Sequence, residues 1–186
     1  MLEQRIQQQF FECADLLGQA AGSLGRPIAV LAEAVFGCVT GGGKVLVAGS
    51  DAGSVLARLL AANLAGRFER ERPPLAALAL RHDALQGLAP QVQALGQPGD
   101  LLLLVDPGGA AAALLEAARH AQAQEMTVAV LTGADTSAWR PLLAETDVLV
   151  AVPHQRAARV TETHLLMLHC LCDAVDLQLM GELETA

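Results

Sequence analysis

The stretch Lys44-Val45-Leu46-Val47-Ala48, followed by Gly49-Ser50-Asp51-Ala52-Gly53-Ser54, decides the fold. Its first part is a short apolar run that predicts a buried strand, and its second part is a glycine-containing turn that predicts the start of a helix. Similar runs recur, separated by segments of helical character, at Leu75 to Leu80, Leu101 to Val105, Thr127 to Leu131 and Val148 to Val152. Strands that are apolar on both faces are typical of a parallel sheet covered by helices on both sides. We therefore expect an α/β fold, a three-layer αβα sandwich around a five-stranded parallel sheet.

Long helices are predicted on both sides of this sheet-forming region. Apolar residues recur from Ile6 to Ala20 at three- and four-residue spacing, which places them on one helical face. Pro27 interrupts the pattern and is well placed to begin a second helix. A last helix is predicted from about Arg159 to Met180. We expect a single domain over residues 1–186, with a helical segment at 1–40 and an α/β core with the last helix at 44–180.

Composition and charge disfavour several classes of function. Twelve basic against twenty acidic residues give a net charge of −8, which disfavours direct binding to nucleic acid. The amino terminus lacks the pattern of a signal peptide, and no uninterrupted apolar run approaches the ~20 residues that span a bilayer. The four cysteines lack metal-ligand spacing, as expected for free thiols in a reducing compartment. We expect a soluble, cytoplasmic protein without membrane contact, metal or cofactor.

Two turns lie where ligands of parallel sheets bind, between the end of a strand and the start of the next helix. The first offers Gly49, Ser50, Gly53 and Ser54, whose backbone amides and hydroxyls are candidates to hold a phosphate or a sugar. The second, Asp106-Pro107-Gly108-Gly109, is a poorer phosphate cradle, because its aspartate is acidic and its proline has no amide hydrogen. Glycine and small polar residues also occur at such turns when no ligand binds, so a purely structural role stays open for both.

Several segments carry a resemblance to a known family. They are Gly43-Lys44-Val45-Leu46, Gly66-Arg67-Phe68-Glu69-Arg70-Glu71-Arg72-Pro73, Gln93-Ala94-Leu95-Gly96, Leu131-Thr132-Gly133, and Ala158-Arg159 through His169-Cys170-Leu171-Cys172-Asp173. Over nearly its whole length the chain resembles the SIS-domain (sugar isomerase) proteins, in the branch that includes phosphoheptose isomerase and the DnaA initiator-associating protein. The resemblance implies a flavodoxin-like fold and a homotetramer of D2 symmetry, in which the N-terminal helices and the long last helix serve oligomerisation.

The resemblance also implies positions for an active site, and this chain departs from the family there. The glutamate that would share proton transfer with a last-helix histidine is replaced by Asn63, so that only His169 of the pair remains. The positions of a family metal site hold Leu59, Asn63, Thr161 and His169, which do not make a zinc site. The segment between Leu80 and Gln91 is shorter than in the family. We therefore expect no catalytic residues, with His169 and Glu162 as candidate remnants of a site or, alternatively, as ordinary helix residues at a subunit contact.

These features lead to one main expectation and two alternatives. The main expectation is a non-enzymatic, tetrameric regulator of replication initiation that resembles the DnaA initiator-associating protein and binds a replication initiator protein. Leu179 and Met180, near the end of the last helix, are its candidate partner surface. The first alternative is a diverged phosphoheptose isomerase that converts sedoheptulose 7-phosphate by means of Ser50, Ser54 and His169. The second alternative is a sensor that binds a sugar phosphate.

Overall fold

A five-stranded parallel sheet in the order β2-β1-β3-β4-β5 lies at the centre of the computed structural model, which describes residues 1–81 and 87–181. The register pairs Gly49 with Val105 and Asp106 with Thr132, so that three strands end at one edge of the sheet. The predicted parallel sheet of five strands is confirmed, although β2 covers only half of the predicted run from Leu75 to Leu80 and β5 ends one residue before Val152. The strands are β1 (Val45–Gly49), β2 (Ala77–Ala79), β3 (Leu101–Asp106), β4 (Thr127–Thr132) and β5 (Val148–Ala151).

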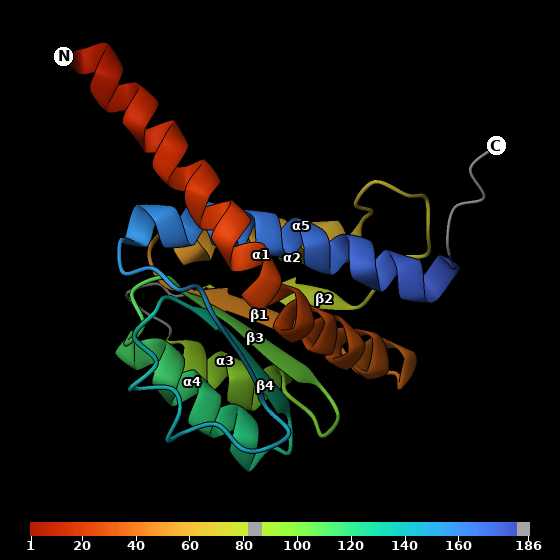
Figure 1. The fold of residues 1–186 in the computed structure, drawn as a ribbon. Helices are drawn as coiled ribbons and strands as arrows, with labels where there is room; N and C mark the ends of the chain where they lie inside the picture. The colour runs from red at the N-terminus through yellow and green to blue at the C-terminus, as the bar shows by residue number, and fades with distance from the viewer. Residues whose placement is uncertain (82–86, 182–186) are drawn as a thin grey trace.

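Helices cover both faces of the sheet, as the apolar character of both faces predicts (Figure 1). Val45 and Val47 point to the layer formed by α1, α2 and α5, whereas Leu46 and Ala48 point to the layer formed by α3 and α4. This alternation produces two separate hydrophobic cores and confirms the three-layer sandwich. The helices are α1 (Leu2–Thr40), α2 (Ala52–Ala65), α3 (Leu88–Leu95), α4 (Ala112–Ala123) and α5 (Ala157–Met180).

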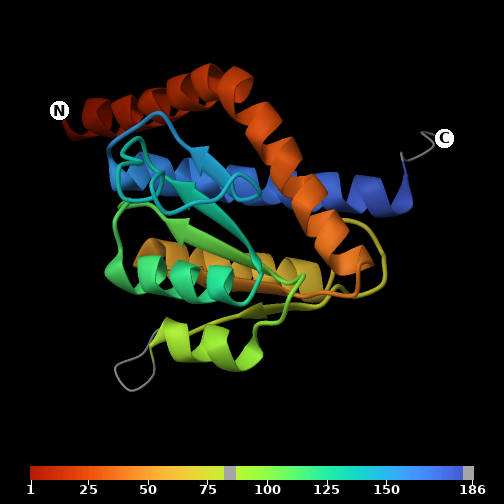
Figure 2. The same ribbon diagram turned by 90° about the horizontal axis from the view of Figure 1, so that it is seen from below.

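The structure differs from the sequence-based expectation at the N-terminus, where one helix replaces the expected two. α1 runs from Leu2 to Thr40 with Pro27 inside it. A proline within a helix removes one backbone hydrogen bond, which bends a helix that packing holds in place. The buried side chains of Leu24 and Leu31 lie on either side of Pro27, and α1 packs against α5. Figure 2 shows that α1 is bent rather than broken.

The first part of α1, drawn in red, projects away from the sheet (Figure 1). It carries the exposed side chains of Ile6, Phe10 and Phe11. By length and composition alone, α1 is also long and apolar enough to cross a membrane, a test that core helices of soluble proteins pass as well. Polar residues are interspersed along α1, so no uninterrupted apolar run marks it in the sequence.

A buried ion pair fixes the loop that follows α2. Arg72 and Asp176 are both buried, and the guanidinium Nε of Arg72 donates a hydrogen bond to the carboxylate of Asp176 on α5. The same guanidinium donates to the backbone carbonyls of Leu64 and Asn63, at 2.9 Å and 2.8 Å. Arg72 thereby ties the end of α2 to the last helix.

Candidate functional site

The turn after β1 is built around two glycines that allow close backbone contacts. A Cβ atom on Gly49 would lie 2.2 Å from the carbonyl oxygen of Gly53, and one on Gly53 would lie 2.2 Å from that of Val105. Both distances are far shorter than any van der Waals contact, so each position requires glycine. Between them, Asp51 adopts a φ of 46°, in the left-handed region that few side chains tolerate.

The carboxylate of Asp106 lies at the centre of this edge of the sheet. It is almost completely buried, and it accepts a hydrogen bond from the hydroxyl of Ser50 at 2.8 Å. The indole Nε1 of Trp139 donates to its other oxygen at 3.1 Å, and the backbone amide of Ala111 donates to that same oxygen at 3.2 Å. Asp106 therefore joins the turn after β1, the start of α4 and the segment after β4.

A cavity of about 330 Å³ opens beside this turn, and we refer to it as the Gly49 cavity. The backbone amides of Ser50, Gly53 and Ser54 donate to the carbonyls of Val105, Ser50 and Asp51, so these amides are already hydrogen-bonded. The prediction that Gly49, Ser50, Gly53 and Ser54 hold a phosphate or a sugar stays a prediction. The cavity is lined by Gly49, Ser50, Asp51, Ser54, Leu88, Ala111, Ala112, Ala113 and Leu114.

His169 lies away from the Gly49 cavity, toward the other end of α2. Its half-buried imidazole stacks on Phe68, which follows the end of α2, with ring centroids 5.3 Å apart. Asn63, at the position of the family glutamate, is near the thiol of Cys172, whose pKa is raised to about 12 by burial. Ten residues separate Gly53 from Asn63, an axial rise of about 15 Å. One chain therefore does not bring His169 and the Gly49 turn into one site.

Glu162 belongs to a third region, between α5 and the projecting part of α1. Its carboxylate accepts a hydrogen bond from the guanidinium of Arg159 at 2.5 Å, and Arg159 also donates to the backbone carbonyl of Gln9 at 2.5 Å. A separate cavity of about 360 Å³ lies here, lined by Gln9, Phe10, Cys13, Arg159 and Glu162. The two candidate remnants, His169 and Glu162, thus face different surroundings.

Two polar residues at the sheet edge were not singled out from the sequence. Trp139 is completely buried and supplies one of the hydrogen bonds to Asp106. His164 is completely buried as well, and its Nε2 lies 3.2 Å from the carbonyl oxygen of Thr132. The occurrence of Trp139 as the only tryptophan would have drawn attention to it. Nothing in the spacing of His164 distinguishes it from the half-buried histidines His120, His154 and His169.

Burial lowers the pKa of His164 to about 4, although the carbonyl of Thr132 and the charge of Asp106 act in the opposite direction. The unfolded chain, with a histidine pKa near 6.5, therefore binds a proton more readily than the folded chain. Stability should fall as the pH drops from about 6.5 to about 4, by about 2 kcal/mol between pH 7 and pH 5. Urea unfolding of the wild type and His164→Gln at both pH values measures this difference. A pH dependence as steep in His164→Gln as in the wild type contradicts the assignment, and His154→Gln is the control.

The two residues of the expected partner surface differ in exposure. Met180 is exposed, but Leu179 is half-buried and packs against the core, so the two do not form one exposed patch. Within residues 1–81 and 87–181, no cluster of three or more His, Cys, Asp or Glu side chains is arranged to hold a metal ion. The segment expected to be shorter than in the family includes residues 82–86, which lie outside the described residues.

Comparisons with known proteins connect this architecture to one family. The sequence profile of the SIS domain matches residues 9–133. A phosphoheptose isomerase from Methylibium petroleiphilum is 50% identical over 98% of this chain and 97% of its own length. The structure of a phosphoheptose isomerase from Francisella tularensis superimposes with a TM-score of 0.89 at 34% identity, covering 95% of this chain and 98% of that chain. The structure of a phosphoheptose isomerase from Neisseria gonorrhoeae superimposes with a TM-score of 0.88 at 32% identity, and the match covers 95% of this chain and 99% of that chain.

These relatives contradict the main functional expectation drawn from the sequence. The expectation of a non-enzymatic regulator that binds a replication initiator is wrong, because relatives that match nearly from end to end are phosphoheptose isomerases. That expectation gave too much weight to single residues at which this chain differs from the family, such as Asn63 in place of the glutamate. The resemblance to the SIS fold and to its isomerases is confirmed. The chain belongs to the SIS-domain family, in its phosphoheptose isomerase branch.

Proposed function

We propose that this protein is a diverged sugar isomerase of the phosphoheptose isomerase type, which interconverts the aldose and ketose forms of an open-chain heptose or its 7-phosphate. The observation that carries this proposal is the 50% identity to a phosphoheptose isomerase over 98% of the chain. The free thiols of its four cysteines support a cytoplasmic location.

His169 is the side chain best suited to the chemistry. Aldose–ketose isomerisation moves one proton between the first two carbons of the sugar through an enediol, while a second proton moves between the two oxygens. One base suffices when it removes the proton from one carbon and returns it to the neighbouring carbon on the same face. An imidazole nitrogen can accept a proton and then donate it again, as this transfer requires, and the side chain of His169 is half-buried. The amide of Asn63 cannot accept it, so its role is limited to hydrogen bonding.

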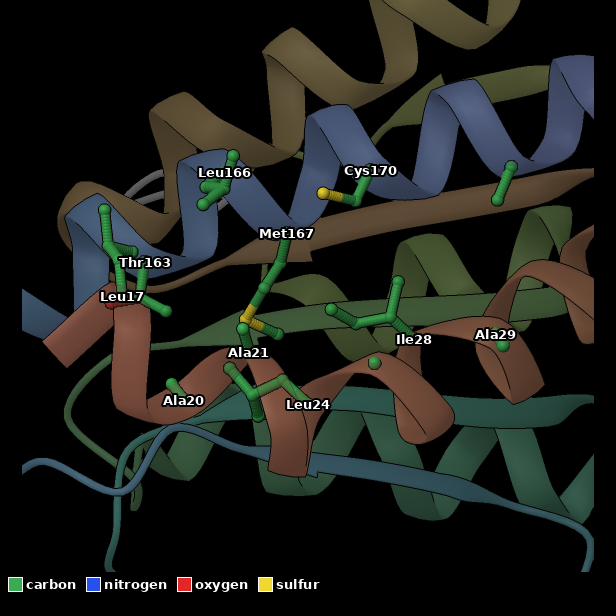
Figure 3. Close-up of a pocket in the computed structure, with 12 residues that line it drawn as sticks. Leu17, Ala20, Ala21, Leu24, Ile28, Ala29, Thr163, Leu166, Met167 and Cys170 are labelled. Carbon is green, nitrogen blue, oxygen red and sulfur yellow. The ribbon is translucent and has the colours of Figure 1, made fainter.

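A homotetramer with D2 symmetry forms part of the proposal. The tetramer is supported by apolar surface on α1 and α5, on the sides of these helices that point away from the sheet. An apolar groove of about 340 Å³ runs between α1 and α5, and Figure 3 shows Leu17, Leu24 and Ile28 of α1 opposite Leu166 and Met167 of α5. The projecting part of α1 adds the exposed phenylalanines. A second chain would bury these surfaces and bring its own side chains near His169.

Replacement of Phe10 by aspartate tests the tetramer. Phe10 is 72% exposed in the single chain, so the change should leave the fold intact while placing a charge in the proposed interface. Sedimentation velocity is expected to give a tetramer for the wild type and smaller species for Phe10→Asp. Leu95→Asp, at the end of α3 on the opposite face, is the control and should remain tetrameric. A monomeric wild type at micromolar concentration contradicts this part of the proposal.

The activity itself is tested by incubating the full chain with sedoheptulose 7-phosphate and, separately, with sedoheptulose. Conversion of either ketose to the corresponding aldose, followed by NMR, is the expected result. A second candidate function, a sugar sensor, is favoured by Asn63, which leaves one histidine without the second acid–base group. A sensor would be stabilised against heat by the sugar without converting it. Absence of conversion at high protein concentration would exclude the enzyme.

A further inference from the structure

The imidazole of His169 is held by an aromatic ring rather than by a hydrogen bond. Its centroid lies 5.3 Å from that of Phe68, and the two ring planes are tilted by 33°. This separation is typical of an offset aromatic pair. His154 and His164 differ, because a ring nitrogen of each lies within hydrogen-bond distance of a backbone group. Within residues 1–81 and 87–181, the imidazole of His169 has no hydrogen-bond partner, so Phe68 is the neighbour that favours one ring orientation.

The position of Phe68 is itself fixed from both sides. The guanidinium of Arg72 donates hydrogen bonds to the backbone carbonyl of Gly66 at 3.3 Å and to that of Pro73 at 3.1 Å. These two residues bracket Phe68 in the loop after α2, and Arg72 is paired with Asp176 on α5, the helix that carries the histidine. The half-buried Phe68 side chain also packs against the core between the sheet and its α1, α2 and α5 layer. The ring is therefore a fixed surface rather than a mobile loop side chain.

Ring orientation matters for the proton transfer assigned to His169. One nitrogen has to reach two neighbouring carbons of the sugar, and a small displacement of a reacting group slows such a step strongly. Catalytic histidines are commonly oriented by a hydrogen bond from the second ring nitrogen to a carboxylate or a carbonyl. Stacking restricts rotation of the ring as well, but it leaves both nitrogens without a protein partner.

We propose that Phe68 is a positioning residue for the isomerisation, because its ring holds the imidazole of His169 in the orientation that proton transfer requires. This inference rests on the proposed function and adds a residue that sequence comparison with the catalytic pair does not single out. Phe68 acts through His169 and touches no reacting atom.

Phe68→Leu tests the inference by removing the aromatic face while keeping an apolar side chain. With the sugar that the wild type converts, sedoheptulose or its 7-phosphate, kcat is expected to fall by about 10–100-fold, as for a misplaced reacting group. KM should stay within about twofold, because Phe68 does not bind the substrate. Phe68→Tyr restores the ring and should keep kcat within about threefold of the wild type. Phe36→Leu makes the same change at another half-buried phenylalanine, on α1, and should leave kcat unchanged.

NMR of the imidazole protons supplies a readout that does not depend on activity. The signal of His169 is identified by its loss in His169→Ala. The ring current of Phe68 should displace this signal in the wild type, so the signal is expected to move in Phe68→Leu and to stay in place in Phe36→Leu. A through-space contact between the protons of the two rings is expected in the wild type.

Four results overturn the inference. They are an unchanged kcat in folded Phe68→Leu, an equal loss of kcat in Phe36→Leu, no recovery in Phe68→Tyr, and a His169 signal that is the same with and without Phe68. If circular dichroism shows that Phe68→Leu is unfolded, the through-space contact in the wild type decides, and its absence overturns the inference. If the wild type converts neither sugar, the proposed function fails, whereas the NMR signals still show whether Phe68 orients the imidazole.

Discussion

Replacing Arg72 by methionine is expected to lower the free energy of unfolding by about 3–5 kcal/mol. The physical reason is the charge left behind. Asp176 is 1% exposed, and one of its carboxylate oxygens already lacks a hydrogen-bond partner within residues 1–81 and 87–181. Without Arg72, the carboxylate would remain buried and unpaired, and the carbonyls of Leu64 and Asn63 would lose their donor. Urea unfolding at fixed protein concentration measures the effect.

The matched control is the ion pair between Arg67 and Glu71, whose side chains are 65% and 79% exposed. Arg67→Met should cost less than about 0.5 kcal/mol, because an exposed pair in water contributes little. The double replacement Arg72→Met with Asp176→Leu should be less destabilising than the sum of the single changes, since it removes both charges together. Equal effects of Arg72→Met and Arg67→Met would show that the buried pair does not tie α2 to α5.

Replacing His169 by alanine is expected to reduce isomerase activity by about 10²–10⁴-fold, the usual loss when a general base is removed. The fold should persist, because the side chain is only half-buried and its ring contacts one aromatic neighbour, Phe68. Losing such a contact costs about 0.5–1.5 kcal/mol. The assay is the conversion of sedoheptulose or its 7-phosphate under saturating conditions, with folding checked by circular dichroism.

His120→Ala is the control for this experiment. His120 lies on α4, in the helical layer on the opposite face of the sheet from α5, so its loss should leave the rate unchanged within about twofold. Full activity in His169→Ala would assign the proton transfer to another group and remove His169 from the proposed site.

Much of the fold could be predicted because the pattern that encodes it is local. The five apolar runs were visible along the chain, and runs that are apolar on both faces occur mainly in covered parallel sheets. The prediction of two N-terminal helices was wrong because it relied on the local effect of Pro27 alone. Local propensity disfavours proline inside a helix, but packing of Leu24 and Leu31 on either side of it outweighs that preference.

The site was harder to predict, because its contacts join residues far apart in the chain. The acidic character of Asp106 was apparent, but its hydrogen bonds to Ser50 and Trp139 span 56 and 33 residues. Likewise, the burial of His164 depends on how α5 crosses the end of β4, which spacing alone does not show. The sequence also could not show whether the replacement of the family glutamate by Asn63 outweighs the overall similarity to isomerases, since one substitution does not reveal how much activity remains.

The expectation that the segment between Leu80 and Gln91 is shorter than in the family stays a prediction. The alignment with the Methylibium isomerase spans 194 positions, more than the 186 residues of this chain, so that relative contains residues which this chain lacks.

Deuterium incorporation into the sugar tests the central claim most directly. The full-length protein is incubated in D2O with sedoheptulose and, in parallel, with sedoheptulose 7-phosphate, and the hydrogens on the first two carbons are followed by NMR. An isomerase that uses His169 is expected to replace carbon-bound hydrogen with deuterium at these positions and to form the aldose. His169→Ala should do neither at a measurable rate. Absence of both exchange and aldose formation with the folded wild type, at protein concentrations comparable to that of the sugar, would contradict the account.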